Sequence, residues 1–250
     1  MGAQVTGPLA GRVAIVTGGA RGIGLGIGAR LARDGAAVVI WDRDLSPFDA
    51  KAAGFTPAAL VPVDIADLAS VERAHAQTMA RTGRIDILIN NAGINGPVAP
   101  TWEYPVEAWH QVLAVDLTGV FHCCRVVIPT MKAAGYGRIV NISSAAGKEG
   151  VPGIAAYAAA KAGVIGYTKS IARELVGTGV LVNSLAPVIT ETELFREMTA
   201  EHISSSKAKI PMGRFLTIPE IAAMVAWIAG PECTFCTGFT FDLSGGRATY

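Results

Sequence analysis

Residues 12–24, which read RVAIVTGGARGIG, decide the fold of this chain. After Arg12, the first residues of this stretch are mostly apolar and rich in β-branched side chains, which predicts a buried strand. A glycine turn follows at once, and the next helix is predicted over residues 24–34. Glycines let a backbone turn tightly and approach a pyrophosphate, and a helix N-terminus offers unpaired N–H groups. We therefore expect a phosphate-binding turn at Gly18, Gly22 and Gly24, whose spacing differs from the GxGxxG fingerprint.

Strands and helices alternate along most of the chain. Apolar β-rich runs predict strands at residues 12–17, 36–41, 60–64, 86–90, 137–143, 180–184 and 238–242. Amphipathic runs predict helices at residues 24–34, 68–82, 107–134, 155–176 and 219–229. This alternation predicts an α/β fold, a doubly wound (Rossmann) three-layer sandwich with a parallel sheet. With no internal repeat or linker, we expect one domain over residues 1–250.

One segment breaks the alternation. Residues 192–211 follow the sixth predicted strand and contain several glutamates and a polar run. A weakly structured insertion near the carboxyl ends of strands often serves as a lid. We expect a lid-like insertion here, and an ordinary pair of surface helices is the alternative.

Composition excludes several classes of protein. The chain is 51% hydrophobic and 16% charged, which is typical of a sheet buried on both faces. The net charge of +1 provides no basic surface for nucleic acid. No uninterrupted run of about 18 apolar residues occurs, so no membrane-spanning helix is expected. Residues 1–10 lack a secretory signal pattern, and we expect a cytoplasmic protein.

The cysteines suggest neither a metal site nor a redox motif. Cys123 and Cys124 lie in an apolar helical run, which predicts buried thiols. Cys233 and Cys236 have CxxC spacing, but a second such pair is missing and the four histidines are scattered.

Asp42 ends the second predicted strand, 18 residues after Gly24. An acidic residue there accepts hydrogen bonds from both hydroxyls of an adenosine ribose and repels the extra phosphate of NADP. Arg21 and Arg43 lie nearby and favour that phosphate, so the charges conflict. Because Asp42 stands at the strand tip, we expect NAD as cofactor. A simple turn residue is the alternative.

Three further motifs follow in order. Residues 90–93 read NNAG, Ser144 precedes Tyr157 by 13 residues, and Tyr157 and Lys161 have YxxxK spacing. With the glycine turn, these motifs closely resemble the short-chain dehydrogenase/reductase family from about residue 9 onward. The resemblance implies a single domain with a seven-stranded parallel sheet. It also implies a homotetramer, or a dimer, joined through the long helices.

The resemblance also implies cofactor contacts. The glycine turn would bind the pyrophosphate, and the segment after the third predicted strand would flank the adenine. The segment after the fourth would line the adenosine ribose, and the segment after the sixth would bind the nicotinamide. The implied cofactor residues are Gly18, Arg21, Gly22, Ile23, Gly24, Asp42, Asp64, Ile65, Asn91, Ala92, Gly93, Val115, Tyr157, Lys161, Pro187, Thr190 and Thr192.

Two positions depart from the family's pattern. Asp116 stands where the family often has an Asn that holds a water in a proton relay behind the lysine. An Asp can also hold a water but adds charge near Lys161, so we expect Asp116 to take the relay role. Val188 follows Pro187 where the family usually has Gly, and its side chain is expected to crowd the nicotinamide or substrate pocket.

Acid–base chemistry is assigned to Ser144, Tyr157 and Lys161. Hydride transfer to a ketone leaves negative charge on the oxygen, which must gain a proton from a group within hydrogen-bond reach. The Tyr157 hydroxyl fits, and Lys161, one helical turn later, favours its phenolate form. Ser144 donates a hydrogen bond to the developing alkoxide. The alternatives are an ordinary surface pair for Tyr157 and Lys161 and a helix cap for Ser144.

The substrate is less legible. Lys148 is expected to meet a carboxylate, and Asn95 and Glu149 to bind hydroxyls, which favours a sugar, a polyol or a keto-sugar acid. A solvated loop charge is the alternative for Lys148. Two other functions stay open. One is a 3-oxoacyl thioester reductase using NADPH, against which Asp42 argues. The other is a non-catalytic dinucleotide-binding sensor, which has no need of the catalytic residues.

Overall fold

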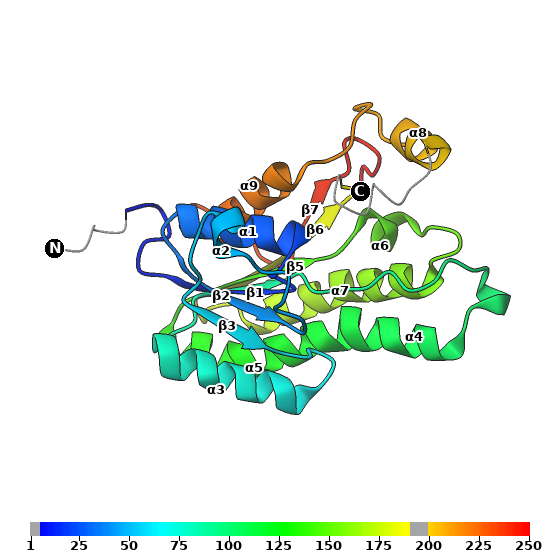
Figure 1. Ribbon diagram of the computed structural model, residues 1–250. Coiled ribbons are helices and arrows are strands. Elements are labelled where there is room, and N and C mark those ends of the chain that lie inside the picture. The colour runs from blue at the N-terminus through cyan, green and yellow to red at the C-terminus, as the bar shows by residue number, and fades with distance from the viewer. Residues whose placement is uncertain (1–5, 191–199) are drawn as a thin grey trace.

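The computed structural model describes residues 6–190 and 200–250, without the side chains of residues 200–203. Its strands form one sheet of seven, every neighbouring pair parallel, in the order β3-β2-β1-β4-β5-β6-β7 (Figure 1). The strands in that order are β3 (Ala59–Pro62), β2 (Ala37–Asp42), β1 (Val13–Thr17), β4 (Ile87–Asn90), β5 (Gly137–Ile142), β6 (Val180–Pro187) and β7 (Thr240–Leu243). The predicted α/β doubly wound fold is confirmed, including its seven parallel strands.

Helices cover both faces of this sheet (Figure 1). The face with the first helix carries α1 (Gly22–Arg33), α2 (Ala50–Ala53) and α9 (Ile218–Ala229). The opposite face carries α3 (Leu68–Thr82), α4 (Val106–Leu113), α5 (Gly119–Ala134) and α7 (Ala155–Glu174). Two further helices, α6 (Ala145–Glu149) and α8 (Ala200–Ala208), follow strands β5 and β6.

A separate apolar cluster fills each side of the sheet. Ile27 of α1 and Val225 of α9 belong to the first cluster. Cys123 and Cys124 of α5 belong to the second, and both are buried free thiols, as predicted. All residues of β1, β4 and β5 are buried, and β1 and β4 accordingly read as nearly continuous apolar runs rather than as alternating patterns.

The helix predicted over residues 107–134 is interrupted. It begins as α4, passes through a π-helical turn at Ala114–Thr118 and continues as α5. A π-helical turn inserts an extra residue into a helix and occurs frequently at functional sites. In this chain the turn carries Asp116, which is fully buried.

The same helical run, Val106–Ala134, is long and apolar enough to cross a membrane by length and composition alone, with a mean hydropathy of 1.6. Charged residues at positions 107, 116, 125 and 132 interrupt this run, so the sequence shows no uninterrupted apolar stretch there. The inner face of α5 lies in the core of the protein, so the run packs as a core helix.

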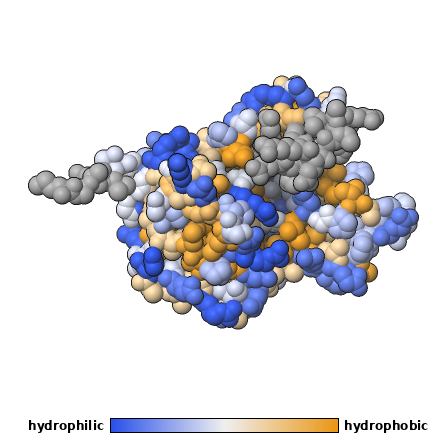
Figure 2. Space-filling view, viewed as in Figure 1, coloured by the Kyte–Doolittle hydropathy of each residue, from blue (hydrophilic) through white to orange (hydrophobic). Residues whose placement is uncertain are grey.

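Figure 2 shows hydrophilic and hydrophobic residues interspersed over the face of the molecule that it draws.

The boundaries differ from the predictions in detail. The third strand spans Ala59–Pro62 rather than 60–64, and the first helix begins at Gly22. Helices α2 and α6 were not predicted, because four or five residues are too few to show a helical period. The first part of the predicted lid, residues 192–199, lies outside the described residues, and α8 occupies much of the remainder.

Candidate active site

The glycine turn lies at the carboxyl end of β1 and depends on glycine at defined positions. Gly18 and Gly22 have φ angles of +61° and +58°, in the left-handed region that favours glycine. A Cβ atom on Gly24 would lie 2.1 Å from the carbonyl oxygen of Gly18. A Cβ atom on Gly18 would lie 2.9 Å from the Cα atom of Ala92. The backbone segments of this turn can approach this closely only without side chains.

Helix α1 begins with an open N-terminus. Its N-cap residue, Arg21, is extended and makes no side-chain cap, and the first turn has no acidic residue. The first N–H groups of a helix have no partner within the helix, and they carry the positive end of its dipole. Together with the close-packed turn, this end of α1 suits a pyrophosphate, so the described residues fit a dinucleotide cofactor.

Asp42 lies against this turn. Its Oδ2 accepts a hydrogen bond of 3.0 Å from the N–H of Ala20, and its Oδ1 accepts one of 3.2 Å from the N–H of Asp44. The carboxylate is thereby placed beside the turn at the tip of β2, where the adenosine ribose is expected. The side chains of Arg21 and Arg43 are exposed on either side of it.

Asn91 braces the glycine turn from the neighbouring strand. Its amide Nδ2 donates to the carbonyl oxygens of Thr17 and Gly18 at 3.0 and 3.2 Å. The Thr17 hydroxyl oxygen in turn accepts from the N–H groups of Asn91 and Ala92, both at 3.0 Å. Thus the NNAG motif and the glycine turn form one hydrogen-bonded unit. The side chain of Asn91 is already used in holding the turn.

Three expected cofactor residues lie after β3 and just before α5, and two of them, Asp64 and Ile65, are expected to flank the adenine. Asp64 is exposed, and its Oδ1 accepts from the N–H of Ala66 at 2.9 Å. Ile65 is buried against Gly119, where a Cβ atom would meet its side chain at 2.7 Å. Val115 is half-buried in the π-helical turn. The adenine contacts of Asp64 and Ile65 and the cofactor contact of Val115 stay predictions.

Lys161 is buried beside Tyr157. Its ammonium lies 5.5 Å from the centre of the Tyr157 ring and donates a hydrogen bond of 3.1 Å to the carbonyl oxygen of Ile142, the last residue of β5. Only 4% of the lysine is exposed, so the alternative of an ordinary surface pair is wrong. The YxxxK spacing therefore places a cation next to the Tyr157 ring.

Asp116 completes a buried ion pair with this lysine. Its Oδ2 lies 3.2 Å from Lys161 Nζ, and its Oδ1 accepts a hydrogen bond of 2.8 Å from the N–H of Ile94. Burial raises the pKa of Asp116, and the neighbouring ammonium opposes that shift. A Cβ atom on Gly93 would lie 2.9 Å from the Asp116 carboxylate, so glycine is needed there for the pair to form.

Ser144 follows β5 and is the N-cap of α6. Its hydroxyl oxygen accepts a hydrogen bond of 3.1 Å from the N–H of Ala146. A hydroxyl that accepts one hydrogen bond still has its own proton to donate. The helix-cap alternative is therefore correct for this side chain, and it is compatible with the expected hydrogen bond to a substrate oxygen.

The segment after β6 lies partly in the core. Pro187 is buried, and Val188 packs in the apolar cluster on the α1 face, where it lines a cavity of about 790 Å³. Other walls of this cavity come from α9 and β7 rather than from Ser144, Tyr157 or Lys161. Thr190 donates from its hydroxyl to the carbonyl oxygen of Val188 at 3.0 Å. Thr192 lies outside the described residues.

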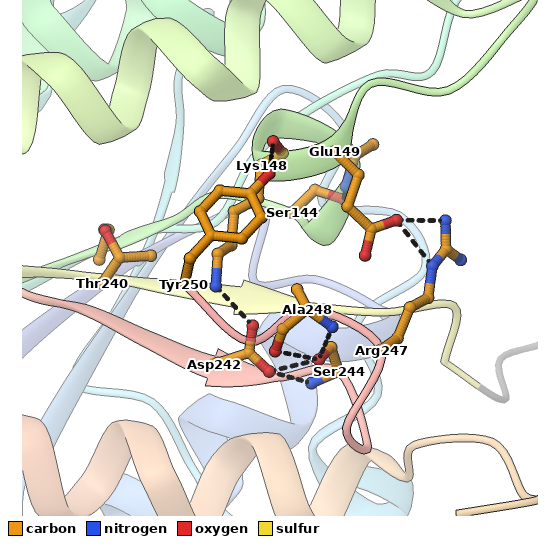
Figure 3. Close-up of polar contacts among 11 residues, drawn as sticks. Ser144, Lys148, Glu149, Thr240, Asp242, Ser244, Arg247, Ala248 and Tyr250 are labelled. Atoms are coloured by element: carbon orange, nitrogen blue, oxygen red, sulfur yellow. Dashed lines mark hydrogen bonds and ion pairs between the residues drawn. The ribbon is translucent and has the colours of Figure 1, made fainter. Parts of the chain in front are cut away.

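Two of the three predicted substrate residues have partners within the chain (Figure 3). Lys148 lies 2.9 Å from Asp242, and Glu149 lies 2.7 Å from Arg247. The side chain of Lys148 is 8% exposed, so the solvated-charge alternative is wrong. Asn95 is exposed in the loop after β4. The substrate roles of all three stay predictions.

The sequence analysis did not single out Asp242 or Arg247. They lie 94 and 98 residues after their partners, and no local pattern joins positions so far apart. Among the residues that the structure describes, no group of three histidine, cysteine or carboxylate side chains is arranged to hold a metal ion.

Known proteins resemble this chain over nearly its whole length. A family model described as short chain dehydrogenase matches residues 12–203. The 2-dehydro-3-deoxy-L-rhamnonate dehydrogenase (NAD(+)) of Sphingomonas sp. (strain SKA58) is 46% identical over 244 residues, covering 98% of each chain. The crystal structure of NAD+-bound xylitol dehydrogenase is 29% identical, with a TM-score of 0.90, and covers 95% of this chain and 99% of its own. The 3-ketoacyl-(acyl-carrier-protein) reductase from Brucella melitensis complexed with NADH is 33% identical, with a TM-score of 0.90, and covers 96% and 100%.

Proposed function

Because the chain belongs to the short-chain dehydrogenase family, we propose that it oxidises a secondary hydroxyl of a sugar, polyol or sugar acid with NAD, and reduces the matching ketone in the reverse direction. The observation that carries this proposal is the buried Lys161 ammonium beside Tyr157. It lies at the carboxyl ends of the strands, where the glycine turn also lies. One seven-stranded sheet positions both sets of residues, which supports a single domain.

Each residue has a stated part in the proposed reaction. NAD, when bound, accepts the hydride from the substrate carbon. The glycine turn and α1 hold its pyrophosphate, and Asp42 holds the adenosine ribose. Tyr157 as phenolate takes the proton of the substrate hydroxyl, with Lys161 favouring the phenolate. Ser144 donates a hydrogen bond to the substrate oxygen and stabilises the charge that develops there.

Two observations support NAD over NADP. The carboxylate of Asp42 is fixed beside the turn and would repel a phosphate on the ribose. In addition, the most similar relatives named above include an NAD(+) enzyme and a structure with bound NAD+. A 3-oxoacyl thioester reductase remains the second candidate, because the Brucella melitensis reductase is 33% identical.

The assembly and the compartment are part of the proposal. A homotetramer joined through α5 and α7 is supported by Phe121, a large apolar side chain that is exposed on α5. Light scattering of the purified protein measures the molar mass of the assembly and tests the tetramer.

A cytoplasmic location is supported by the four free cysteines, since reducing compartments keep thiols unpaired.

The test is NAD reduction by the purified protein over a panel of sugars, polyols, sugar acids, simple secondary alcohols and 3-hydroxyacyl thioesters. Tyr157→Phe should lower turnover at least ~100-fold, the usual contribution of a general acid or base, while NAD still binds. Tyr136→Phe is the control, because it removes the same hydroxyl from a tyrosine whose ring lies against Arg12 and Arg138 instead of Lys161. Near-normal turnover of Tyr157→Phe would remove Tyr157 from its role, and activity only on thioesters would favour the second candidate.

A further inference from the structure

The end of the chain folds back over α6. Residues 244–250, here called the C-terminal strap, follow β7, and the C-terminus lies beside α6 (Figure 1). The strap begins with a hydrogen-bonded turn, in which the Ser244 N–H donates to Asp242 Oδ1 at 2.8 Å and the Ala248 N–H donates to Ser244 Oγ at 2.8 Å. The strap therefore has a defined conformation.

Three contacts fasten the strap and β7 to the last turn of α6 (Figure 3). Lys148 Nζ lies 2.9 Å from Asp242, and Arg247 pairs with Glu149 at 2.7 and 2.8 Å. The Tyr250 hydroxyl also donates to the carbonyl oxygen of Lys148. The four charged side chains are between 8% and 27% exposed, so water and salt screen these pairs less than they screen surface pairs.

The charge of Asp242 is well supported in this arrangement. Burial raises the pKa of its carboxyl, but hydrogen bonds from Ser244 and Lys148 outweigh burial and hold the pKa below its usual value. Asp242 is therefore ionised at neutral pH, as the attachment to Lys148 requires.

The opposite side of α6 faces the catalytic residues. A Cβ atom on Gly147 would lie 2.6 Å from the backbone carbonyl carbon of Lys161, so α6 packs directly on α7 at that residue. Ser144 is the N-cap of α6. A helix of five residues has little stability of its own, and its position depends on its neighbours. Thus α6 joins the strap to both Ser144 and Lys161.

We propose that the C-terminal strap positions α6, and through it the Ser144 hydroxyl, for hydride transfer. Asp242, Arg247 and Tyr250 are then positioning residues, and Lys148 and Glu149 are their anchors rather than contacts to substrate. The inference rests on the function proposed for Ser144 and Lys161.

The first test removes one attachment at a time, with Arg247→Met and Asp242→Asn. For one neutral polyol and one sugar acid that the wild type oxidises, kcat should fall about 10-fold, because small displacements of reacting groups slow catalysis strongly. The Kd for NAD should stay within about twofold, since the attachments removed lie on α6 and not on the glycine turn. Amide hydrogen exchange over α6, measured without NAD, should become faster.

Arg30→Met is the matched control. It breaks the similarly shielded ion pair of 2.8 Å between Arg30 and Asp34, at the end of α1 that lies away from the glycine turn. Neither kcat nor exchange over α6 should change in this variant. A rescue variant combines Glu149→Arg with Arg247→Glu, which reverses the second pair and leaves Asp242 as the acceptor of the strap turn. It should return kcat to within about 3-fold of the wild type, because opposite charges again face each other.

Three results would overturn the proposal. One is unchanged kcat in both strap variants despite faster exchange over α6. Another is a higher KM for the sugar acid alone in Asp242→Asn, with unchanged kcat, which would assign Lys148 to the substrate carboxylate. The third is unchanged exchange over α6 in the strap variants. This last measurement needs no turnover. If the wild type reduced no NAD, the proposed function would be wrong, and amide hydrogen exchange would still show whether the strap holds α6 in place.

Discussion

Asp116 and Lys161 form an ion pair of 3.2 Å whose side chains are 0% and 5% exposed. Charges shielded from water interact more strongly than surface charges, but only if the geometry compensates for lost hydration. Here Ile94 donates to the carboxylate and Ile142 accepts from the ammonium, so both partners are held. The negative charge of Asp116 partly neutralises the cation on which the Tyr157 phenolate depends.

Asp116→Asn should move the pH profile of alcohol oxidation downward. The variant keeps the size of the side chain and the acceptor for Ile94, but it removes the anion facing Lys161. The ammonium then favours the Tyr157 phenolate more strongly, so half-maximal oxidation should occur about one pH unit lower. The measurement is kcat against pH, together with the ultraviolet titration of tyrosinate in the protein without cofactor.

The sign of this shift tests the ion pair. Among the described residues, the charged or titratable groups that face Asp116 are Lys161 and, beyond it, Tyr157, both on α7. Tyr157→Phe in both backgrounds identifies the tyrosine that titrates. An unchanged or higher pH of half-maximal oxidation in Asp116→Asn would mean that the carboxylate does not oppose the lysine charge.

Asp42→Asn should weaken the preference for NAD over NADP. The amide can still accept from the Ala20 N–H, but it no longer repels a phosphate on the ribose, and Arg21 and Arg43 remain to attract one. We expect the ratio of kcat/KM for NAD to that for NADP to fall about 10-fold, an effect of roughly 1.4 kcal/mol. Asp44→Asn, two residues along and exposed, is the control. If the NAD-to-NADP ratio of kcat/KM were equal in Asp42→Asn and Asp44→Asn, Asp42 would not determine the choice of cofactor.

Local patterns were sufficient to predict most of the fold. The apolar run of β1 and the glycines after it are contiguous in sequence, and the structure places them as a buried strand, a turn and the start of α1. The spacing of Tyr157 and Lys161 likewise fixes their shared helix face, and the two side chains are neighbours. In both cases the physical cause acts over a few residues.

Features that depend on residues far apart in the sequence could not be predicted from local patterns. The π-helical turn puts an extra residue into an otherwise regular apolar helix, and it carries Asp116, whose buried partner Lys161 lies on another helix. Lys148 was expected to meet a substrate carboxylate, because the sequence shows no partner for it. The structure places it against Asp242. Nothing local distinguishes a lysine awaiting a ligand from one paired across the fold.

Gly24→Ala should weaken NAD binding. Its Cβ atom would lie 2.1 Å from the Gly18 carbonyl oxygen and 2.6 Å from the Asn91 amide, so the turn has to open. We expect at least a 10-fold higher Kd for NAD and a loss of stability of about 1–3 kcal/mol, typical of an overpacked site. Gly166→Ala on α7 is the control, because nothing lies within 4 Å of the added atom. A normal Kd in Gly24→Ala would contradict the placement of the pyrophosphate.

Asp86→Asn should destabilise the protein in a pH-dependent manner. Asp86 directly precedes β4 and is 3% exposed, paired with Arg84 at 2.6 Å and with Arg12 at 3.0 Å, and it accepts from the Val13 N–H at 2.9 Å. Burial raises the pKa of this carboxyl, but Arg84, Val13 and Arg12 together outweigh burial and lower it. At neutral pH the loss should be about 2–3 kcal/mol, as for other shielded charge pairs.

The lowered pKa fixes the sign of the pH dependence. The folded protein binds a proton at Asp86 less readily than the unfolded chain does, so this carboxylate stabilises the fold fully above the usual carboxyl range, near pH 4. That stability disappears as the pH falls through the lower pKa of the folded state. The difference in unfolding free energy between wild type and Asp86→Asn should therefore be constant above about pH 5 and shrink below about pH 4. Urea denaturation at both pH values measures it, with Asp67→Asn, which breaks an exposed pair of 3.7 Å with Arg73, as the control. An equal loss at both pH values would assign the effect to packing, because only the ionised carboxylate loses its advantage in acid.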